Sequence, residues 1–338
     1  MMATWQHWMV GQIDASIAAA ALLAAAVFWR RRLSPKVRSA ILLIAMISLA
    51  LPPWLRSPWS EALVDLPPID DTRLLAAEWL TPRLTVALFS IGLVVTAVLL
   101  IRLAWQTRAM ARRLQSLAPA PAALEARVNA LACQASIDLR VSPADGPFAS
   151  GLVRKVIVLP APLIDLLDHD AMDAVLAHEV AHHARRDLWW LAAGAVLKSV
   201  VWFNPLAHLI AGALVAARED GSDDWAVTHT SRDPFSYAHA LLQSARSMTM
   251  APPMAAGAHP MGPRLRRLLD ERADRGHRLT PVGVFAILIA AAVALPGAHM
   301  PSLEDAAEHG APGRAGDDPV IVIKRVLGER GLEEIRNR

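Results

Sequence analysis

The chain alternates long apolar stretches with short, strongly basic ones. Four stretches are apolar over nearly the length that crosses a bilayer, for which about 20 residues span roughly 30 Å of hydrocarbon; they cover 10–29, 39–55, 84–105 and 282–298. Basic residues gather beside them, in 30–38, 102–113 and 261–278. Because basic loops stay on the cytoplasmic side of a membrane, the pattern predicts a multi-pass membrane protein whose N-terminus and tail lie outside.

One helical stretch in the middle of the chain carries candidate chemistry. Acidic residues open it at 168–173, as at a helix N-terminus, and His178-Glu179-x-x-His182 follows. Side chains four positions apart share one helix face, so both imidazoles can bind one metal ion, and zinc suits them. Glu179 is placed to act as a general base. The alternative is a charged, histidine-rich helix face that binds no metal.

A third ligand is needed, and the acidic segment 218–227 offers it. Glu219 and Asp223 lie four residues apart, so one helix face presents both. We interpret Glu219 as the third ligand and Asp223 as the acceptor for a ring N–H of a ligand histidine. The alternative is the solvated acidic start of an ordinary helix.

Other residues near the motif have lesser parts in the prediction. The run Val156-Ile157-Val158 is β-prone, and as an edge strand it would pair with a substrate backbone. A core strand without a ligand is the alternative. Candidates for stabilising the oxyanion of the reaction are His229, Tyr237 and His239; we interpret each of them as a surface or helix-packing residue instead, and Asp187 as structural.

The apolar stretch 188–217 constrains the topology. A full crossing would put His182 and Glu219 on opposite sides of the membrane, and one zinc ion would then not reach both. The chain must therefore turn back, and Asn204-Pro205 is the natural break. Because the two arms differ in length, at about 1.5 Å per residue, we expect a further bend near Arg186-Asp187.

These motifs occur in a recognisable order. The sequence runs through Gly146-Pro147-Phe148, 156–160, His178 to His182, Phe203-Asn204-Pro205 and Glu219 to Val227. This order resembles the BlaR/MecR-type membrane metallopeptidases, which are gluzincins related to the Ste24 and HtpX proteases. The resemblance covers about 145–245 and the membrane helices. One departure is Gly221-Ser222-Asp223, where the family usually has Ala-Cys-Asp.

The resemblance implies a function and a site. It implies zinc on His178, His182 and Glu219, with Glu179 as the base, in a multi-pass protein of the bacterial plasma membrane. The family's receptors act on a winged-helix repressor and thereby induce genes. Their penicillin-binding sensor carries S-x-x-K, which this sequence lacks, so we do not expect direct β-lactam sensing here.

The expected fold class is a mainly α-helical integral membrane protein. Four transmembrane helices carry an α+β zincin domain inserted between the third and the fourth. The predicted division is three transmembrane helices in 1–121, a cytoplasmic, membrane-adjacent peptidase in 122–279, a fourth transmembrane helix in 280–299 and an extracytoplasmic tail in 300–338.

Composition narrows the function classes. The chain is 54% hydrophobic with a net charge of +3, so a membrane lipid environment is expected and a broad nucleic-acid surface is not. The single Cys133 excludes internal disulfides and a cysteine-rich metal site. We expect a zinc endopeptidase that cleaves a protein substrate such as a cytoplasmic repressor. The alternatives are an HtpX-like quality-control protease and a catalytically silent signalling scaffold, and the sequence leaves open whether the protein forms a homo-oligomer.

Overall fold

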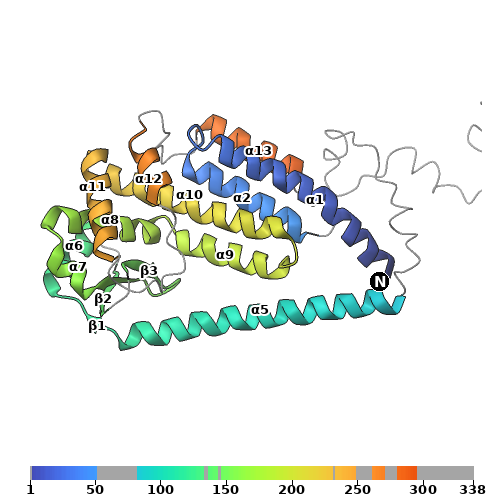
Figure 1. The fold of residues 1–338 in the computed structure, drawn as a ribbon, viewed down its shortest axis with the longest axis horizontal. Coiled ribbons are helices and arrows are strands. Elements are labelled where there is room, and N and C mark those ends of the chain that lie inside the picture. Colours follow the sequence, from blue (N-terminus) through green and yellow to red (C-terminus); the bar gives the residue numbers. More distant parts are fainter. Residues whose placement is uncertain are drawn as a thin grey trace, which may run out of the picture. The chain divides into compact units, whose positions relative to one another are not determined.

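Helices dominate the part of the chain that the structure describes. The computed structural model describes residues 2–51, 82–132, 136–143, 146–230, 233–248, 261–270 and 280–294. The helices are α1 (Met2–Phe28), α2 (Pro35–Ala50), α5 (Pro82–Ser116), α6 (Ala122–Leu131), α7 (Ala161–Leu166), α8 (His169–Ala184), α9 (Asp187–Val200), α10 (Pro205–His229), α11 (Pro234–Met248), α12 (Met261–Leu268) and α13 (Pro281–Ala294) (Figure 1). Residues 1–298 form one unit and 299–338 a second. The predicted tail, most of the loop 56–82 and Cys133 lie outside the described residues.

A small mixed sheet lies beside α8. Its strands are β1 (Ala118–Pro119), β2 (Asp138–Ser142), β3 (Phe148–Ser150) and β4 (Val156–Pro160), in the order β1-β2-β4-β3. β2 and β4 are parallel, and the β1–β2 and β3–β4 pairs are antiparallel. A mainly helical fold with an α+β part is therefore confirmed.

The prediction of an edge strand at Val156-Ile157-Val158 is wrong. This run pairs with β2 on one side and with β3 on the other, so its backbone is not free for a substrate. The physical reason is visible in the sequence, because a continuous apolar run without alternation is buried on both faces of a sheet. Among the described residues, β3 is the strand at that edge of the sheet.

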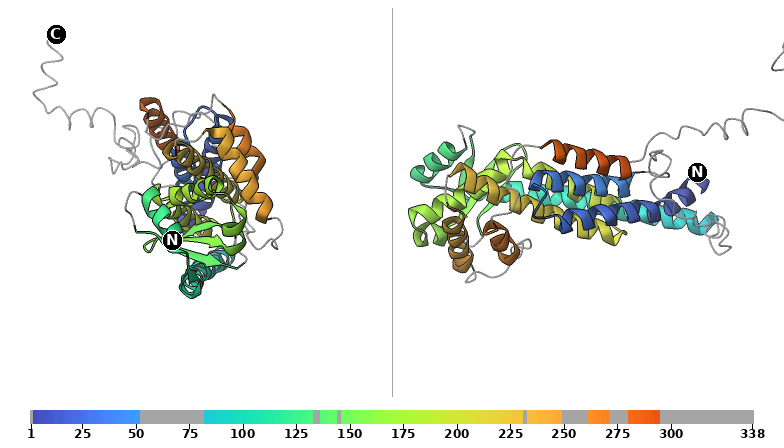
Figure 2. Two further views of the ribbon diagram at one scale, coloured as in Figure 1. Left: turned by 90° about the vertical axis from the view of Figure 1, so that its left-hand side faces the viewer. Right: turned by 90° about the horizontal axis from the view of Figure 1, so that it is seen from above.

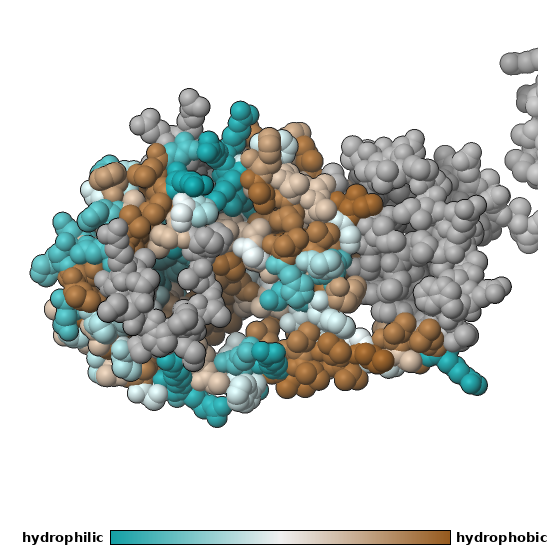
Figure 3. Space-filling view, in the orientation of Figure 1, coloured by the Kyte–Doolittle hydropathy of each residue, from teal (hydrophilic) through white to brown (hydrophobic). Residues whose placement is uncertain are grey.

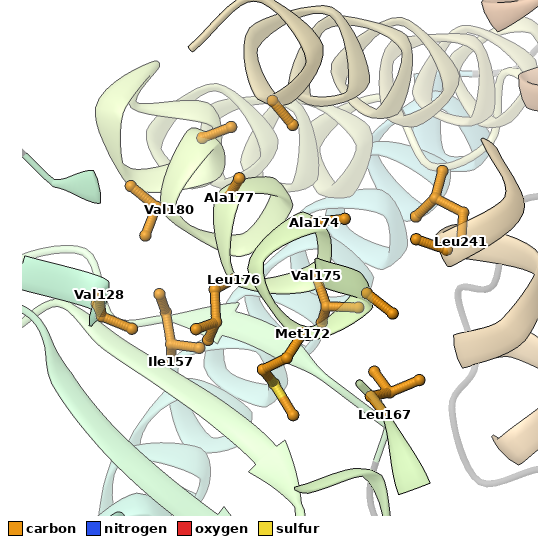
Figure 4. Close-up of a cluster of buried hydrophobic side chains, with 14 of the residues drawn as sticks. Val128, Ile157, Leu167, Met172, Ala174, Val175, Leu176, Ala177, Val180 and Leu241 are labelled. Carbon is orange, nitrogen blue, oxygen red and sulfur yellow. The ribbon is translucent and has the colours of Figure 1, made fainter. Parts of the chain in front are cut away.

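The core of the peptidase region forms around α8. Its apolar side chains, such as Val175 and Leu176, pack against β4 and α11 (Figure 4). Asp168 begins the helix, since its Oδ1 accepts a hydrogen bond of 2.7 Å from the backbone N–H of Ala171. The helix ends at Ala184, and Arg186 then takes a left-handed conformation with φ of 59°. The predicted bend near Arg186 is confirmed.

A second apolar core joins the N-terminal helices to α9 and α10. Helices α1, α2 and α13 pack together, and the first half of α10 packs against α2 (Figure 2). Between α9 and α10 the chain reverses at Val201–Asn204, where Asn204 caps α10 through a 3.0 Å hydrogen bond from the Leu206 N–H. The predicted reversal at Asn204-Pro205 is confirmed.

One described helix is long and apolar enough to cross a membrane by itself. It is the segment Val86–Ser116 of α5, none of whose apolar window is buried. The middle of α5 forms a hydrophobic band at the lower edge of Figure 3, with hydrophilic residues at both ends. Two shorter apolar helices, Ala15–Phe28 and Pro281–Ala292, lie where crossings were expected. Four crossings, with their orientation, stay a prediction.

Candidate metal centre

Two histidines of α8 and one glutamate of α10 converge on one point. Nε2 of His178 lies 3.4 Å from Oε2 of Glu219, and Nε2 of His182 lies 3.7 Å from its Oε1. Their ligand atoms all lie within 4.8 Å of one another. Tetrahedral zinc with bonds of about 2.0–2.1 Å holds its ligand atoms roughly 3.4 Å apart. The donor set therefore has the chemistry and the spacing for one such ion.

Small residues let the two helices come close enough for this convergence. Ala174, Ala177 and Ala181 on α8 are fully or almost fully buried, and so is Ala226 on α10. The two helices pack directly against each other there. His183 ties the same helix to the sheet, because its Nε2 lies 3.0 Å from the carbonyl oxygen of Val156. A rigid base of this kind fixes the imidazoles before any ion binds.

His178 is held from behind by a carboxylate and a phenol. Its Nδ1 lies 3.0 Å from Oδ1 of Asp223 and 3.2 Å from the Tyr237 hydroxyl, which itself donates to Asp223 over 3.1 Å. Burial acts to lower the pKa of His178, but hydrogen bonds to Asp223 and Glu219 outweigh it and raise that pKa to about 10. The surrounding carboxylates thus favour a positive charge at this point, which a proton supplies here and a divalent cation also could.

His182 has a carboxylate of its own. Its Nδ1 lies 3.2 Å from Oδ2 of Asp187 and 3.1 Å from Oγ of Ser222. Ser222 also donates to Asp187 over 3.0 Å. The fully buried Asp187 is neutralised by Arg185 at 3.1 Å and Arg218 at 2.8 Å. Each imidazole thus directs Nε2 towards Glu219 and keeps Nδ1 on a buried acid.

The departure at Gly221 has a steric reason in the structure. A Cβ atom at this position would collide with the guanidinium of Arg185, which lies against α10 there. Glycine therefore makes room for the arginine that neutralises Asp187. A glycine in the middle of a helix costs about 1 kcal/mol of helix propensity relative to alanine. The space that it leaves is filled by the guanidinium of Arg185, which forms the buried ion pair with Asp187.

Glu179 lies in the same buried environment. Its side chain is almost fully buried, and burial raises its pKa, while the positive charges of His178 and His182 act in the opposite direction. For Glu219, burial would raise the pKa, but the hydrogen bond with His178 and nearby charges lower it to about 2. Glu219 is therefore a carboxylate at neutral pH, as a metal ligand must be.

An arginine that sequence reasoning missed completes the site. Arg264 of α12 forms two hydrogen bonds to Asp223, of 3.0 and 2.7 Å, and its Nη1 lies 3.1 Å from Oε2 of Glu219. Its Nη2 lies 3.5 Å from Nε2 of His178. In the sequence this residue belongs to the basic stretch 261–278, which the pattern places on the cytoplasmic side of a membrane, so its contacts to Asp223 and Glu219 are visible only in the structure.

Of the other polar residues considered in the sequence analysis, some contact the two histidines and some do not. The structure brings Asp223, Asp187 and Tyr237 to the histidines, although sequence reasoning interpreted the last two as structural or packing residues. His229 instead stacks on Trp225, with ring centroids 3.9 Å apart, and His239 lines a shallow pocket between α8 and α11. The signals that could have identified Asp187 and Tyr237 are the acid five residues after His182 and the single tyrosine of the chain. Metal binding by the convergent set stays a prediction.

The sequence of the chain matches a known family of peptidases. The family model described as BlaR1 peptidase M56 matches residues 6–268. The chain is similar to the methicillin resistance mecR1 protein of Staphylococcus aureus, with 31% identity over 65 residues, which are 19% of this chain and 11% of that protein. It is also similar to the protease HtpX homolog of Halobacterium salinarum, with 38% identity over 66 residues, which are 19% of this chain and 23% of that protein. The chain thus matches less than a quarter of the length of either relative. Because the family model covers most of the sequence, the chain belongs to the BlaR1 peptidase M56 family of membrane metallopeptidases.

Proposed function

We propose that the protein is an integral-membrane zinc-dependent endopeptidase. His178, His182 and Glu219 hold the ion, and the peptidase region, 122–279, faces the cytoplasm. The observation that carries this proposal is the convergence of the three ligand atoms within 4.8 Å, with a buried carboxylate behind each imidazole. The ligand set of imidazoles and one carboxylate is the one that zinc peptidases of the thermolysin type use.

The chemistry divides between the ion and the chain. Zinc, when bound, lowers the pKa of a coordinated water and polarises the carbonyl of the scissile bond. Glu179 would accept a proton from the attacking water as general base and then donate it to the leaving amine as general acid. Its burial raises its pKa and so favours both roles. Arg264 keeps Glu219 and Asp223 in place and adds a fixed positive charge beside them.

An extended substrate backbone has a place to pair at the edge of the sheet. Of the two edge strands among the described residues, β1 and β3, it is β3 that packs against α8, the helix that carries His178 and His182. A peptide added alongside Phe148–Ser150 would form antiparallel or parallel backbone hydrogen bonds next to the site. This assignment replaces the inner strand β4, whose two edges are both paired.

The substrate class that we favour is a cytoplasmic protein whose cleavage relays a signal. The resemblance to the BlaR/MecR-type metallopeptidases implies a repressor of the winged-helix type as the substrate, and the relation to HtpX proteases implies membrane-protein quality control as the second candidate. A catalytically silent scaffold is the third, and the intact His178-Glu179-x-x-His182 motif argues against it.

One variant separates these functions. Glu179→Gln removes the general base and leaves all three ligands, so the variant should retain zinc, lose proteolysis and trap its substrates. Proteomics of cells with the wild type and with Glu179→Gln would then compare accumulated and crosslinked proteins. One dominant DNA-binding protein supports signalling, and many membrane proteins support quality control. A variant that still cleaves its substrate would remove Glu179 from its role.

A further inference from the structure

We propose that α9 and the first half of α10 form a hairpin that enters the lipid bilayer from the cytoplasmic side and ends inside it. The lipid acyl chains are then the partner of the outward face of this hairpin. The proposal concerns residues 188–217, whose sequence is apolar apart from Lys198 and a few neutral polar side chains. The proposal rests on how the hairpin packs against the neighbouring helices, how deep its turn lies and which of its side chains are exposed. It does not depend on peptidase activity.

The hairpin is built into the bundle of predicted membrane helices. Buried side chains of the turn and of α10 share one apolar core with α1, α2 and α13; they are Val201, Ala207, Ile210, Leu214 and Ala217. Helices α10 and α2 pack along each other, and α9 packs against α2 and α5 (Figures 1 and 2). A hairpin that shares its core with membrane helices lies at the same level as they do.

Contacts at the start and in the interior of α10 fix this level. At the turn, Nδ2 of Asn204 donates to Oγ of Ser16 over 2.9 Å. Further along α10, Arg30 donates to both oxygens of Asp220, over 3.0 and 2.6 Å. Helix α1 rises roughly 18 Å from Ser16 to its end at Phe28, just before Arg30, and α10 rises roughly 24 Å from Asn204 to Asp220, at 1.5 Å per residue. The two helices therefore run side by side in the same direction.

The depth of the turn follows from these lengths. Arg30 begins the basic loop that marks the cytoplasmic surface, and the hydrocarbon core is roughly 30 Å thick. A turn about 20 Å from that surface lies well within the core and does not reach the opposite side. The chain can thus return to Glu219 on the side from which it left, as a single metal site requires.

The outward face of the hairpin has the composition of a lipid-facing surface. Large apolar side chains are exposed along it, from 36% at Val200 to 60% at Leu209, with Val196 and Phe203 between these values. Two polar side chains near the turn bond within the hairpin: Ser199 donates to the carbonyl oxygen of Ala195, and Nε2 of His208 lies 2.9 Å from the Trp202 carbonyl oxygen. Internal hydrogen bonding of this kind is what a segment in hydrocarbon needs. Lys198, which is partly buried, is the one charged side chain of 188–217.

The packing inside the hairpin is also typical of membrane helices. Gly194 is buried, and a Cβ atom there would lie 3.0 Å from Cδ2 of Leu214 on α10. Small residues at such crossings let helix backbones approach closely where no hydrophobic effect drives association. At the base, the exposed Trp29 directly precedes Arg30 in the sequence, and the exposed Trp189 and Trp190 follow Asp187 within three residues; aromatic residues are enriched in this way at membrane interfaces. Arg218 lies over the Trp190 ring at 5.1 Å.

The hairpin sets the position of the proposed active site. Glu219 directly precedes Asp220, which is bound to the basic loop, so the metal ligands lie at the level of the cytoplasmic bilayer surface. If the proposed function holds, the protein cleaves peptide bonds that are presented at this surface, and a soluble substrate has to dock there. This consequence rests on the proposed function, whereas the hairpin itself does not.

The test places a fluorophore on single cysteines of the full-length protein in a Cys133→Ser background. Leu209→Cys and Val196→Cys are labelled with bimane and reconstituted into phosphatidylcholine–phosphatidylglycerol vesicles that contain lipids with a spin label on the acyl chain. Val98→Cys on α5, where Val98 is 57% exposed, is the matched control for lipid contact. Val153→Cys, between β3 and β4, where Val153 is 85% exposed, is the control for contact with water.

We expect the spin-labelled lipids to quench bimane at positions 209 and 196 as strongly as at position 98. Bimane at position 153 should lose little fluorescence. Quenching at 209 and 196 no larger than at 153 would overturn the proposal, whether water or a partner protein covers the face. A water-soluble quencher added outside vesicles of each orientation provides the second readout. It should reach 153 from one side and leave 209 unaffected from both; access to 209 from the side opposite to 153 would mean a full crossing and would also overturn the proposal.

Discussion

Each imidazole at the proposed metal site has two neighbours with different tasks. Nε2 of His178 and of His182 faces Glu219, while Nδ1 faces Asp223 or Asp187. The helical motif and the spacing of Glu219 and Asp223 on one helix made most of this set predictable, since both depend on local periodicity. Asp187, Tyr237 and Arg264 needed the structure, because their contacts to the histidines depend on bends and on helices far apart in sequence.

At this scale we predict that Asp187→Asn weakens zinc binding. The substitution replaces a charged acceptor of the His182 ring N–H by a neutral amide, and losses of such outer partners cost about 10–100-fold in metal affinity. Competition with a chromogenic chelator measures the change in the purified protein. Asp165→Asn, at an exposed position of α7, is the control. Equal zinc affinity in both variants would show that Asp187 has no part in holding the ligand.

The elements follow the sequence pattern where the signal is local. The helix start at 168–173, the bend near Arg186 and the break at Asn204-Pro205 were all predicted, because helix-end, turn and proline signals act over a few residues. The sheet order was not, since the parallel pairing of β2 with β4 joins strands that β3 separates in sequence. The same non-local pairing turned the predicted edge strand into an inner one.

The close packing of α9 on α10 gives a prediction at the scale of elements. Gly194→Leu inserts a side chain where Leu214 already fills the space, and overpacking costs about 1–3 kcal/mol. Thermal unfolding in detergent should therefore occur at a lower temperature. Gly212→Leu is the matched control, because no atom lies within 4 Å of a Cβ atom there. A Gly194→Leu protein as stable as Gly212→Leu would contradict the packing described here.

In residues 1–298, the N-terminal helices take part in the site region. Arg30 and Arg38 both bind the buried Asp220, each with a closest distance of 2.6 Å, and Asp220 follows the ligand Glu219. Arg267 of α12 forms an ion pair of 2.6 Å with Asp224, which lies one helical turn after Asp220 on α10. The basic loop 30–38 thus does more than set topology, which is all that its charge indicates in the sequence. The predicted boundary at 122 stays a prediction, although ion pairs cross it.

We expect Arg38→Met to destabilise the protein and to reduce its zinc content. The change leaves part of the charge of Asp220 buried without a partner, and breaking a buried pair costs about 3–5 kcal/mol. Unfolding temperature and zinc per chain are the measurements. Arg32→Met removes the same charge from the same loop at an exposed position, so it controls for altered topology. If both variants behave alike, the loop does not support the site.

The most direct test of the account is the metal content and coordination of the purified full-length protein. Zinc analysis combined with X-ray absorption should find one ion per chain in the wild type, bound by two imidazoles and one carboxylate. Glu179→Gln and the control Asp165→Asn should keep that ion, and Glu219→Gln and His182→Ala should lose it. A Glu219→Gln protein that retained one zinc ion with unchanged coordination would contradict the account.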